Sequence, residues 1–217
     1  TVTSLPVHGY GSWTNVYGYI SDLTGIACFS ALTELKAYNN ELTNLDVSQN
    51  TALHTLNCYS NLLTSLDVSA NTALTSLSCG SNQLTNLNVS NNAALTTLHC
   101  HDNQLTSLNV SANSALDYLR CENNQLTSLN VSSNAALTTL YCKHNKLTSL
   151  DLRNGNNAGI TLIHAWTQGN WNWFMTVYVD DIAVANAKVA SGEWVFCGNA
   201  TGCAGAGGTT INYTFSL

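Results

Sequence analysis

Apolar and polar residues repeat along most of the chain with a fixed period of 21 residues. The frame Leu-x-x-Leu-x-Cys-x-x-Asn begins at Leu53, Leu74, Leu95, Leu116 and Leu137. An earlier copy begins at Leu32, with Ala37 in the position of the cysteine and Asn40 at the end. Within each frame the apolar residues alternate with polar ones, which is the spacing of a half-buried β-strand. The pattern therefore predicts one short strand per repeat.

Each repeat also contains a second frame, Leu-x-x-Leu-x-apolar-x-x-Asn. Its copies begin at Leu42, Leu63, Leu84, Leu105, Leu126 and Leu147, and the last copy ends on glycine instead of asparagine. The same alternation predicts a second short strand in every turn. A fixed period of this length is typical of a solenoid, in which each repeat packs only against its neighbours.

These motifs resemble those of a known group of proteins. Leu-Thr-Ser-Leu-Asp-Val-Ser and Leu-x-x-Leu-x-Cys-x-x-Asn are similar to the nested leucine-rich repeats of secreted and surface proteins from Bacteroidota-like bacteria. The resemblance covers residues 20–157. It implies a β-rich leucine-rich-repeat solenoid with two short parallel strands per turn, capped at both ends. It also implies an extracellular module for recognition or adhesion.

The pattern divides the chain into an N-terminal cap (1–31), six repeats (32–157) and a C-terminal cap (158–217). The end turns of a solenoid lack a neighbour and need a cover. The aromatic residues expected to cover the two ends are Tyr10, Trp13, Tyr17, Tyr19, Trp166, Trp171, Trp173 and Phe174. Residues 2–7 fit the second frame, and residues 20–29 predict a short helical turn. In the C-terminal cap we expect strands over 176–181 and 211–217 and a helix over 183–189.

The eight cysteines do not have the spacing of a disulfide scaffold. Five of them occupy one inward position on successive repeats, namely Cys58, Cys79, Cys100, Cys121 and Cys142. We expect this column to be buried and reduced, because buried free cysteine behaves as a small apolar residue. Cys197 and Cys203 flank the turn-rich segment Gly-Asn-Ala-Thr-Gly and are candidates for one disulfide, which fits an exported protein.

Two columns of asparagine accompany the strands. One runs from Asn40 to Asn145 and the other from Asn50 to Asn134. A buried asparagine side chain can bond backbone groups that the bends of the solenoid leave unpaired. We therefore expect each asparagine to contact the backbone of the adjacent turn.

Composition narrows the possible partners. The net charge is −6 and only 8% of residues are charged, which argues against nucleic acid because phosphate binding needs clustered Lys and Arg. No apolar run approaches the ~20 residues of a membrane span. His99, His101 and His144 predict no catalytic site, and His99, His101 and Glu122 lack an evident further ligand for a metal. We expect a monomer that is not an enzyme and binds no metal or cofactor.

The repeats differ most at the outward positions of the first frame. The second frame repeats Ser or Asn, then Asp or Asn, whereas the first frame carries Tyr, His and Arg, types that are enriched at interfaces. We expect this variable face to bind a ligand through His99, Tyr118, Arg120 and Tyr141, with His101, Glu122 and Lys143 at the edge. A protein ligand fits best, and a glycan is the second choice.

Three other interpretations of the surface remain open. The variation can be neutral drift, since exposed positions are weakly constrained by folding. The chain can be a spacer within a larger surface protein. It can also be an ice-binding protein that uses a regular column of threonine, formed by Thr43, Thr64, Thr85, Thr106, Thr127 and Thr148. Strand propensity already explains threonine at these positions.

Overall fold

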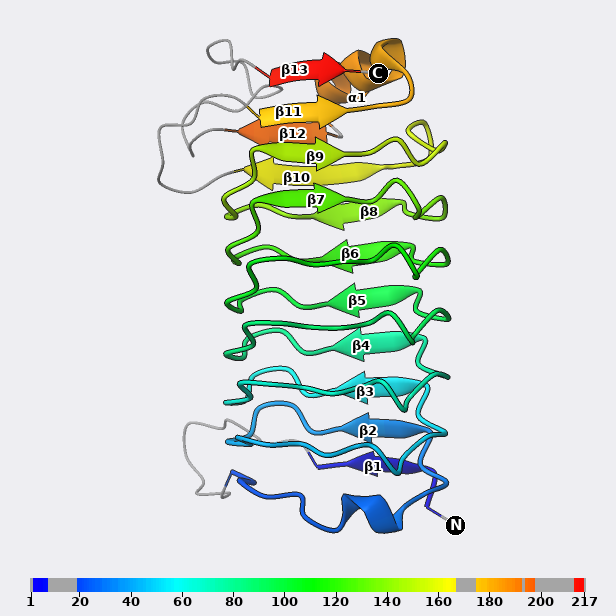
Figure 1. Cartoon of the computed structure of the whole chain (residues 1–217), viewed down its shortest axis with the longest axis vertical. Helices are drawn as coiled ribbons and strands as arrows, with labels where there is room; N and C mark the ends of the chain where they lie inside the picture. The colour runs from blue at the N-terminus through cyan, green and yellow to red at the C-terminus, as the bar shows by residue number, and fades with distance from the viewer. Residues whose placement is uncertain (1, 8–18, 167–174, 193, 198–212, 217) are drawn as a thin grey trace.

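A computed structural model describes residues 2–7, 19–166, 175–192, 194–197 and 213–216. The chain winds into a rod of stacked turns that begins near β1 (Ser4–Pro6) and ends near α1 (Ile182–Ser191) and β13 (Tyr213–Ser216) (Figure 1). The rod is a parallel β-solenoid of about 6 turns with a spacing of ~21 residues. The predicted fold class is therefore confirmed.

The first frames, together with one strand of the N-terminal cap and two of the C-terminal cap, build a nine-stranded parallel sheet. Its strands in spatial order are β1, β2 (Glu34–Lys36), β3 (Thr55–Asn57), β4 (Ser76–Ser78), β5 (Thr97–His99), β6 (Tyr118–Arg120), β8 (Thr139–Tyr141), β10 (Leu162–Trp166) and β12 (Trp194–Cys197). From β2 to β8 each residue pairs with its counterpart in the next repeat, as Leu56 does with Leu77. This register places equivalent side chains in straight columns along the sheet.

The second frames build a smaller sheet of four parallel strands. It contains β7 (Ser128–Asn130), β9 (Ser149–Asp151), β11 (Met175–Tyr178) and β13. The first four repeats keep the alternation of buried and exposed residues in their second frames without forming a strand there. The expectation of two regular strands in every turn is thus correct only towards the C-terminal end, where β11 and β13 add to the ladder.

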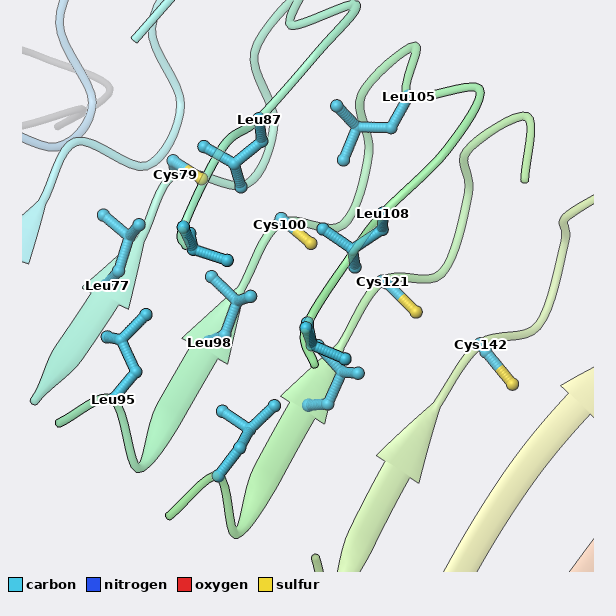
Figure 2. Close-up of a cluster of buried hydrophobic side chains, with 14 of the residues drawn as sticks. Leu77, Cys79, Leu87, Leu95, Leu98, Cys100, Leu105, Leu108, Cys121 and Cys142 are labelled. Atoms are coloured by element: carbon cyan, nitrogen blue, oxygen red, sulfur yellow. The ribbon is translucent and has the colours of Figure 1, made fainter. Parts of the chain in front are cut away.

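The core consists of columns of leucine, valine and cysteine between the two faces of the rod. All five cysteines of the inward column are fully buried and free, and Figure 2 shows four of them stacked beside the core leucines. Burial raises the pKa of the Cys58 and Cys100 thiols to about 12, because a thiolate is poorly solvated in an apolar core. The predicted reduced, buried column is confirmed.

Both asparagine columns bond to the neighbouring turn, as predicted. The Asn61 amide nitrogen donates to the Ala37 carbonyl of the preceding turn at 2.8 Å, and its amide oxygen accepts from the Leu42 N–H at 3.0 Å. In the second column the Asn71 amide nitrogen donates to the Val47 and Asn50 carbonyls, both at 2.9 Å. These bonds satisfy buried backbone groups at the bends and fix the stacking of one turn on the next.

One residue per bend has left-handed backbone, with φ between 50 and 55°. These residues directly precede the first asparagine column and are Asn39, Ser60, Ser81, Asp102, Asn123 and His144. Asparagine and aspartate tolerate this conformation better than serine does, since their side chains can bond locally. The bend therefore favours Asn or Asp here.

The N-terminal strand lies in a different sheet from the one expected. Leu5 pairs with Leu35, so residues 2–7 extend the sheet of the first frames and not the second. Both frames have the same alternation, and the sequence pattern alone does not distinguish them. Pro6 lies on the outermost strand of that sheet, where its missing N–H is tolerated.

The remaining cap predictions are confirmed in part. The helical turn is a 3-10 helix over Ile26–Cys28, and the predicted helix is α1, whose first N–H groups are capped by the Asp181 carboxylate. β11 and β13 match the two predicted strands. Tyr19 is 54% exposed and does not cover the end of the core. The side chain of Trp166, at the end of β10, is not among the described parts of the chain. The other predicted capping aromatics lie outside the described residues, namely Tyr10, Trp13, Tyr17, Trp171, Trp173 and Phe174.

Candidate recognition surface

The outward side chains of the nine-stranded sheet between β3 and β8 form a continuous surface, which we call the variable face. Each turn contributes two side chains from its strand and a third from the residue after the inward cysteine. The register aligns His99, Arg120 and Tyr141 on three successive strands. The structure thus brings the four predicted central residues, which include Tyr118, onto one patch.

Five rings on this face form a line across the strands, which we call the aromatic track. Its members in spatial order are Tyr59, His101, His99, Tyr118 and Tyr141. Successive ring centroids are 5.6, 6.2, 5.3 and 5.9 Å apart, within the range of favourable aromatic pairs. The rings hold one another in place, so the track presents an ordered surface to a ligand.

An ion pair lies beside the track. The Arg120 Nε donates to Glu122 Oε1 at 2.9 Å and its Nη2 donates to the same oxygen, while the guanidinium carbon lies 5.7 Å from the centre of the Tyr141 ring. Glu122 is only 2% exposed, and its second oxygen, Oε2, is buried without a hydrogen-bond partner. The sequence placed Glu122 at an exposed edge. It is buried because the guanidinium that neutralises it lies across it.

His101 is also buried, although the sequence placed it at the exposed edge, and Gly80 explains why. The imidazole lies over Gly80 so closely that a Cβ there would come within 2.6 Å of the ring. Gly80 does not have left-handed backbone, so its geometry alone does not require glycine. Glycine is needed for the close approach of His101. Sequence reasoning missed this role, although Gly80 is the single glycine in a column of Tyr, His, Glu and Lys.

A hollow of about 330 Å³ lies beside the His101 ring on the variable face. It is lined by Asn57, Tyr59, Ser78, His99, His101, Asp102 and Arg120. His101 Nδ1 is buried without a hydrogen-bond partner, and His101 Nε2 lies 3.8 Å from Asp102 Oδ2. The Asp102 Oδ1 accepts from Asn123 Nδ2 at 2.7 Å, which orients the carboxylate.

Both histidines of the track favour their neutral form. Burial lowers the pKa of His99 and of His101 below 6.5, and the positive charge of Arg120 lowers both further. At neutral pH the two rings are therefore uncharged, and each has one nitrogen that accepts a hydrogen bond.

The variable face contains one hydroxyl–imidazole pair among the described residues. Ser78 Oγ lies 3.3 Å from His99 Nδ1. In the described part of the chain no carboxylate bonds to the other side of His99, and the nearby Cys79 N–H already donates to the His99 carbonyl. The described residues thus give this pair no orienting acid, and the Cys79 N–H beside it is not free to bind an oxyanion. Within the same residues, no group of three or more His, Cys, Asp or Glu is arranged to hold a metal.

The other predicted positions are placed as follows. Lys143 follows Glu122 in its column and is half-buried. Cys197 ends β12, but Cys203 lies outside the described residues, and the disulfide stays a prediction. The threonine column is exposed throughout. Within the described ranges, no helix is long and apolar enough to cross a membrane.

Comparison with known proteins gives structural matches only. No protein-family model and no curated protein matches the chain. A leucine-rich-repeat protein of Leptospira interrogans is 28% identical with a TM-score of 0.54, covering 56% of this chain and 34% of its own. Internalin InlF of Listeria monocytogenes is 23% identical with a TM-score of 0.62, covering 84% of this chain and 52% of its own.

Internalin C2 of the same species is 18% identical with a TM-score of 0.52. The match covers 91% of this chain and 77% of the internalin C2 chain. The chain spans about a third of the Leptospira protein and about half of InlF. At these identities the internalins establish the fold alone. The chain therefore has the leucine-rich-repeat fold, and its structural neighbours are bacterial leucine-rich-repeat proteins.

Proposed function

We propose that the chain is a non-catalytic recognition module that binds a protein ligand on the variable face. The observation that carries this proposal is the aromatic track, in which five rings form four successive contacts and extend from repeat 2 to repeat 6. Tyrosine combines a large apolar area with a hydroxyl group, and Tyr and Arg are enriched among residues that dominate binding energy.

The track is already ordered before a ligand arrives. Its side chains stand on paired strands, and Arg120 is held by Glu122 while it lies beside Tyr141. Binding loses less side-chain entropy when the contacting groups are held in advance. A surface of this kind gives more affinity for its area than a flexible one.

The uniform outward positions of the second frame have a structural explanation that the variable face lacks. Six Asp or Asn side chains there each accept a hydrogen bond from the backbone N–H two residues later: Asp46, Asp67, Asn88, Asn109, Asn130 and Asp151. These bonds close the turns, so folding requires the same residue types in each repeat. Folding makes no such demand on Tyr118 or Tyr141, whose counterparts in other repeats include Ser and Thr.

The extracellular location is part of the proposal. It rests on the resemblance to secreted and surface bacterial repeat proteins and on the inert cysteine column. Buried thiols with a pKa near that of Cys58, about 12, are almost entirely protonated, so they react slowly with oxidants. A reduced core is thus compatible with an oxidising environment.

The experiment uses substitutions that the repeats themselves supply. Thr occupies the position of Tyr118 in repeat 2 and Ser occupies that of His99 in repeat 3, so Tyr118→Thr and His99→Ser preserve the fold. The control, Ser107→Ala with Asn109→Asp, lies on the uniform face, where Asp67 already serves as the turn acceptor. Binding to a library of purified extracellular protein domains would be measured by surface plasmon resonance.

For a binding partner found in this way, we expect Tyr118→Thr to weaken affinity at least about thirtyfold, the loss typical of a central aromatic anchor. The uniform-face control should leave affinity unchanged. If only the control variant weakens binding, the variable face is not the recognition surface. A library of immobilised glycans, tested in parallel, identifies a glycan-binding protein if it alone gives a signal.

A further inference from the structure

The hollow beside the His101 ring is lined by side chains that can accept hydrogen bonds. Among the residues that the structure describes, the Asp102 carboxylate accepts a hydrogen bond at Oδ1 from Asn123, while its Oδ2 lies 3.8 Å from His101 Nε2. His101 Nδ1 is buried without a partner, and the His101 side chain is only 8% exposed. A buried polar atom without a partner is costly, and in a native protein it calls for an explanation, of which a bound group is one.

The position of Asp102 determines which nitrogen of His101 accepts. The carboxylate lies on the Nε2 side of the ring, and its negative charge favours the proton on that nitrogen. His101 Nδ1 is then the acceptor. A ligand group that satisfies it must donate a hydrogen bond.

The charges around the hollow favour a cation. Asp102 is negative, whereas the positive charge of Arg120 is offset by Glu122. Tyr59 forms an aromatic wall, and the faces of such rings attract cations. The net charge of −6 adds a long-range attraction for basic partners.

We propose that the hollow beside the His101 ring binds the ammonium group of a lysine side chain on the protein ligand. This inference rests on the proposed function, because it names a specificity subsite on the same face. The ammonium has three donors, which suit His101 Nδ1 and the Asp102 carboxylate, and Tyr59 packs against its alkyl chain. A carboxylate ligand would face Asp102 and leave His101 Nδ1 unpaired.

The first test needs no knowledge of the natural ligand. The probe is lysine blocked at both backbone ends, and its matched control is the same compound acetylated on the side-chain nitrogen. Nuclear magnetic resonance would follow the His101 Cε1–H signal, assigned with the His101→Asn variant, at constant ionic strength. We expect a saturable shift with the lysine probe and a response at least about tenfold weaker with the acetylated one, since the charge is lost.

Two variants locate the site. Asp102→Asn keeps a residue suited to left-handed backbone and keeps the oxygen that accepts from Asn123, but it removes the charge. Gly80→Ser places a Cβ within 2.6 Å of the His101 ring and so displaces this ring, which lines the hollow. Both should abolish or strongly weaken the shift. Asp67→Asn is the matched control, because it changes the net charge by the same amount at a position outside the hollow. Asn88 occupies the same position one repeat later.

Gly80→Ser must be shown to fold, by an unfolding transition as sharp as that of the wild type. If it does not fold, Asp102→Asn alone decides. The inference is overturned if Asp102→Asn binds the probe as tightly as the wild type, or if the acetylated compound or methyl glucoside binds as well as lysine. If the lysine probe does not bind but Tyr118→Thr still weakens the binding of a protein ligand, only this inference is wrong and the proposed function stands.

Acidification supplies an independent readout. The groups around His101 are Tyr59, His99, Asp102, Arg120 and Glu122. As the pH falls from about 7.5 to 5.5, His101 and His99 begin to take up protons, and two positive charges then face the ammonium beside Arg120. Affinity for the lysine probe should fall over this range. An affinity that rises towards pH 5.5 contradicts a cation subsite.

Discussion

Removing Arg120 should destabilise the protein because it leaves the buried Glu122 carboxylate without a countercharge. The substitution is Arg120→Ser, which reproduces Ser78 at the equivalent position of repeat 3 and is compatible with the strand. Glu122 is 2% exposed, and Arg120 Nε is 2.9 Å from its Oε1. Within the described residues its other oxygen has no partner, and Arg120 is the cation that pairs with the carboxylate.

Breaking a fully buried ion pair typically costs 3–5 kcal/mol, as an order of magnitude. Here the Arg120 side chain is 35% exposed, and water that already reaches it weakens the pair. We therefore expect a loss of about 2–3 kcal/mol in the free energy of unfolding. The double variant Arg120→Ser with Glu122→Gly reproduces the Ser78 and Gly80 pair of repeat 3 and removes the stranded charge. It should recover at least about half of the loss.

The assay is urea denaturation followed by circular dichroism, with the slope of the transition checked for each variant. Lys36→Ser is the matched control. Lys36 occupies the position of Arg120 in repeat 1 and pairs with Glu34 at 2.8 Å, but both side chains are about a third or more exposed. Its loss should stay within about 0.5 kcal/mol. If Arg120→Ser is as stable as Lys36→Ser, or the double variant is less stable than the single one, the stranded-charge explanation is wrong.

Three further predictions follow from the core, the bends and the histidines. The cysteine column should not react with a thiol reagent at pH 8 in the folded protein, whereas the exposed Cys28 should react. Rapid labelling of the column in the folded protein would disprove its burial. Cys100→Ala should lower the free energy of unfolding by about 1 kcal/mol, as a small core truncation. Ser81→Asn should stabilise the protein by about 0.5 kcal/mol in urea denaturation, because its φ is 50°, and destabilisation contradicts the preference at the bends. The lowered pKa of His101 means that the unfolded chain binds this proton more tightly. Stability is therefore full above about pH 6.5 and falls below it, and urea midpoints at pH 7.5 and 5.5 should differ less in His101→Gln than in the wild type.

The repeating part of the fold can be predicted from sequence because one rule sets each position many times. The alternation of leucine with polar residues, the asparagine columns and the cysteine column recur in five or six copies. Each copy confirms the others, since in-register stacking places equal residues in equal environments. The sheet that receives residues 2–7 could not be predicted, because the two frames share one alternation and only the partner strand distinguishes them.

The candidate site shows the opposite behaviour. The sequence predicts which face carries the variable residues, but it assigns every outward position to solvent. His101 is buried because its ring lies over Gly80 of the preceding turn, and Glu122 is buried because it pairs with Arg120. These contacts occur once each and have no counterpart in other repeats. A rule derived from the repeat cannot find them, although the lone glycine at position 80 was a usable signal.

Radical footprinting of the complex with an identified protein ligand tests the central claim most directly. Hydroxyl radicals oxidise accessible aromatic and aliphatic side chains, and mass spectrometry locates the modification. The proposed function predicts that ligand binding protects Tyr118 and Tyr141 on the variable face. Tyr19 and Leu62, which are exposed elsewhere at 54% and 43%, should be oxidised equally with and without ligand. Protection of Tyr19 or Leu62 with no change at Tyr118 and Tyr141 would contradict recognition by the variable face.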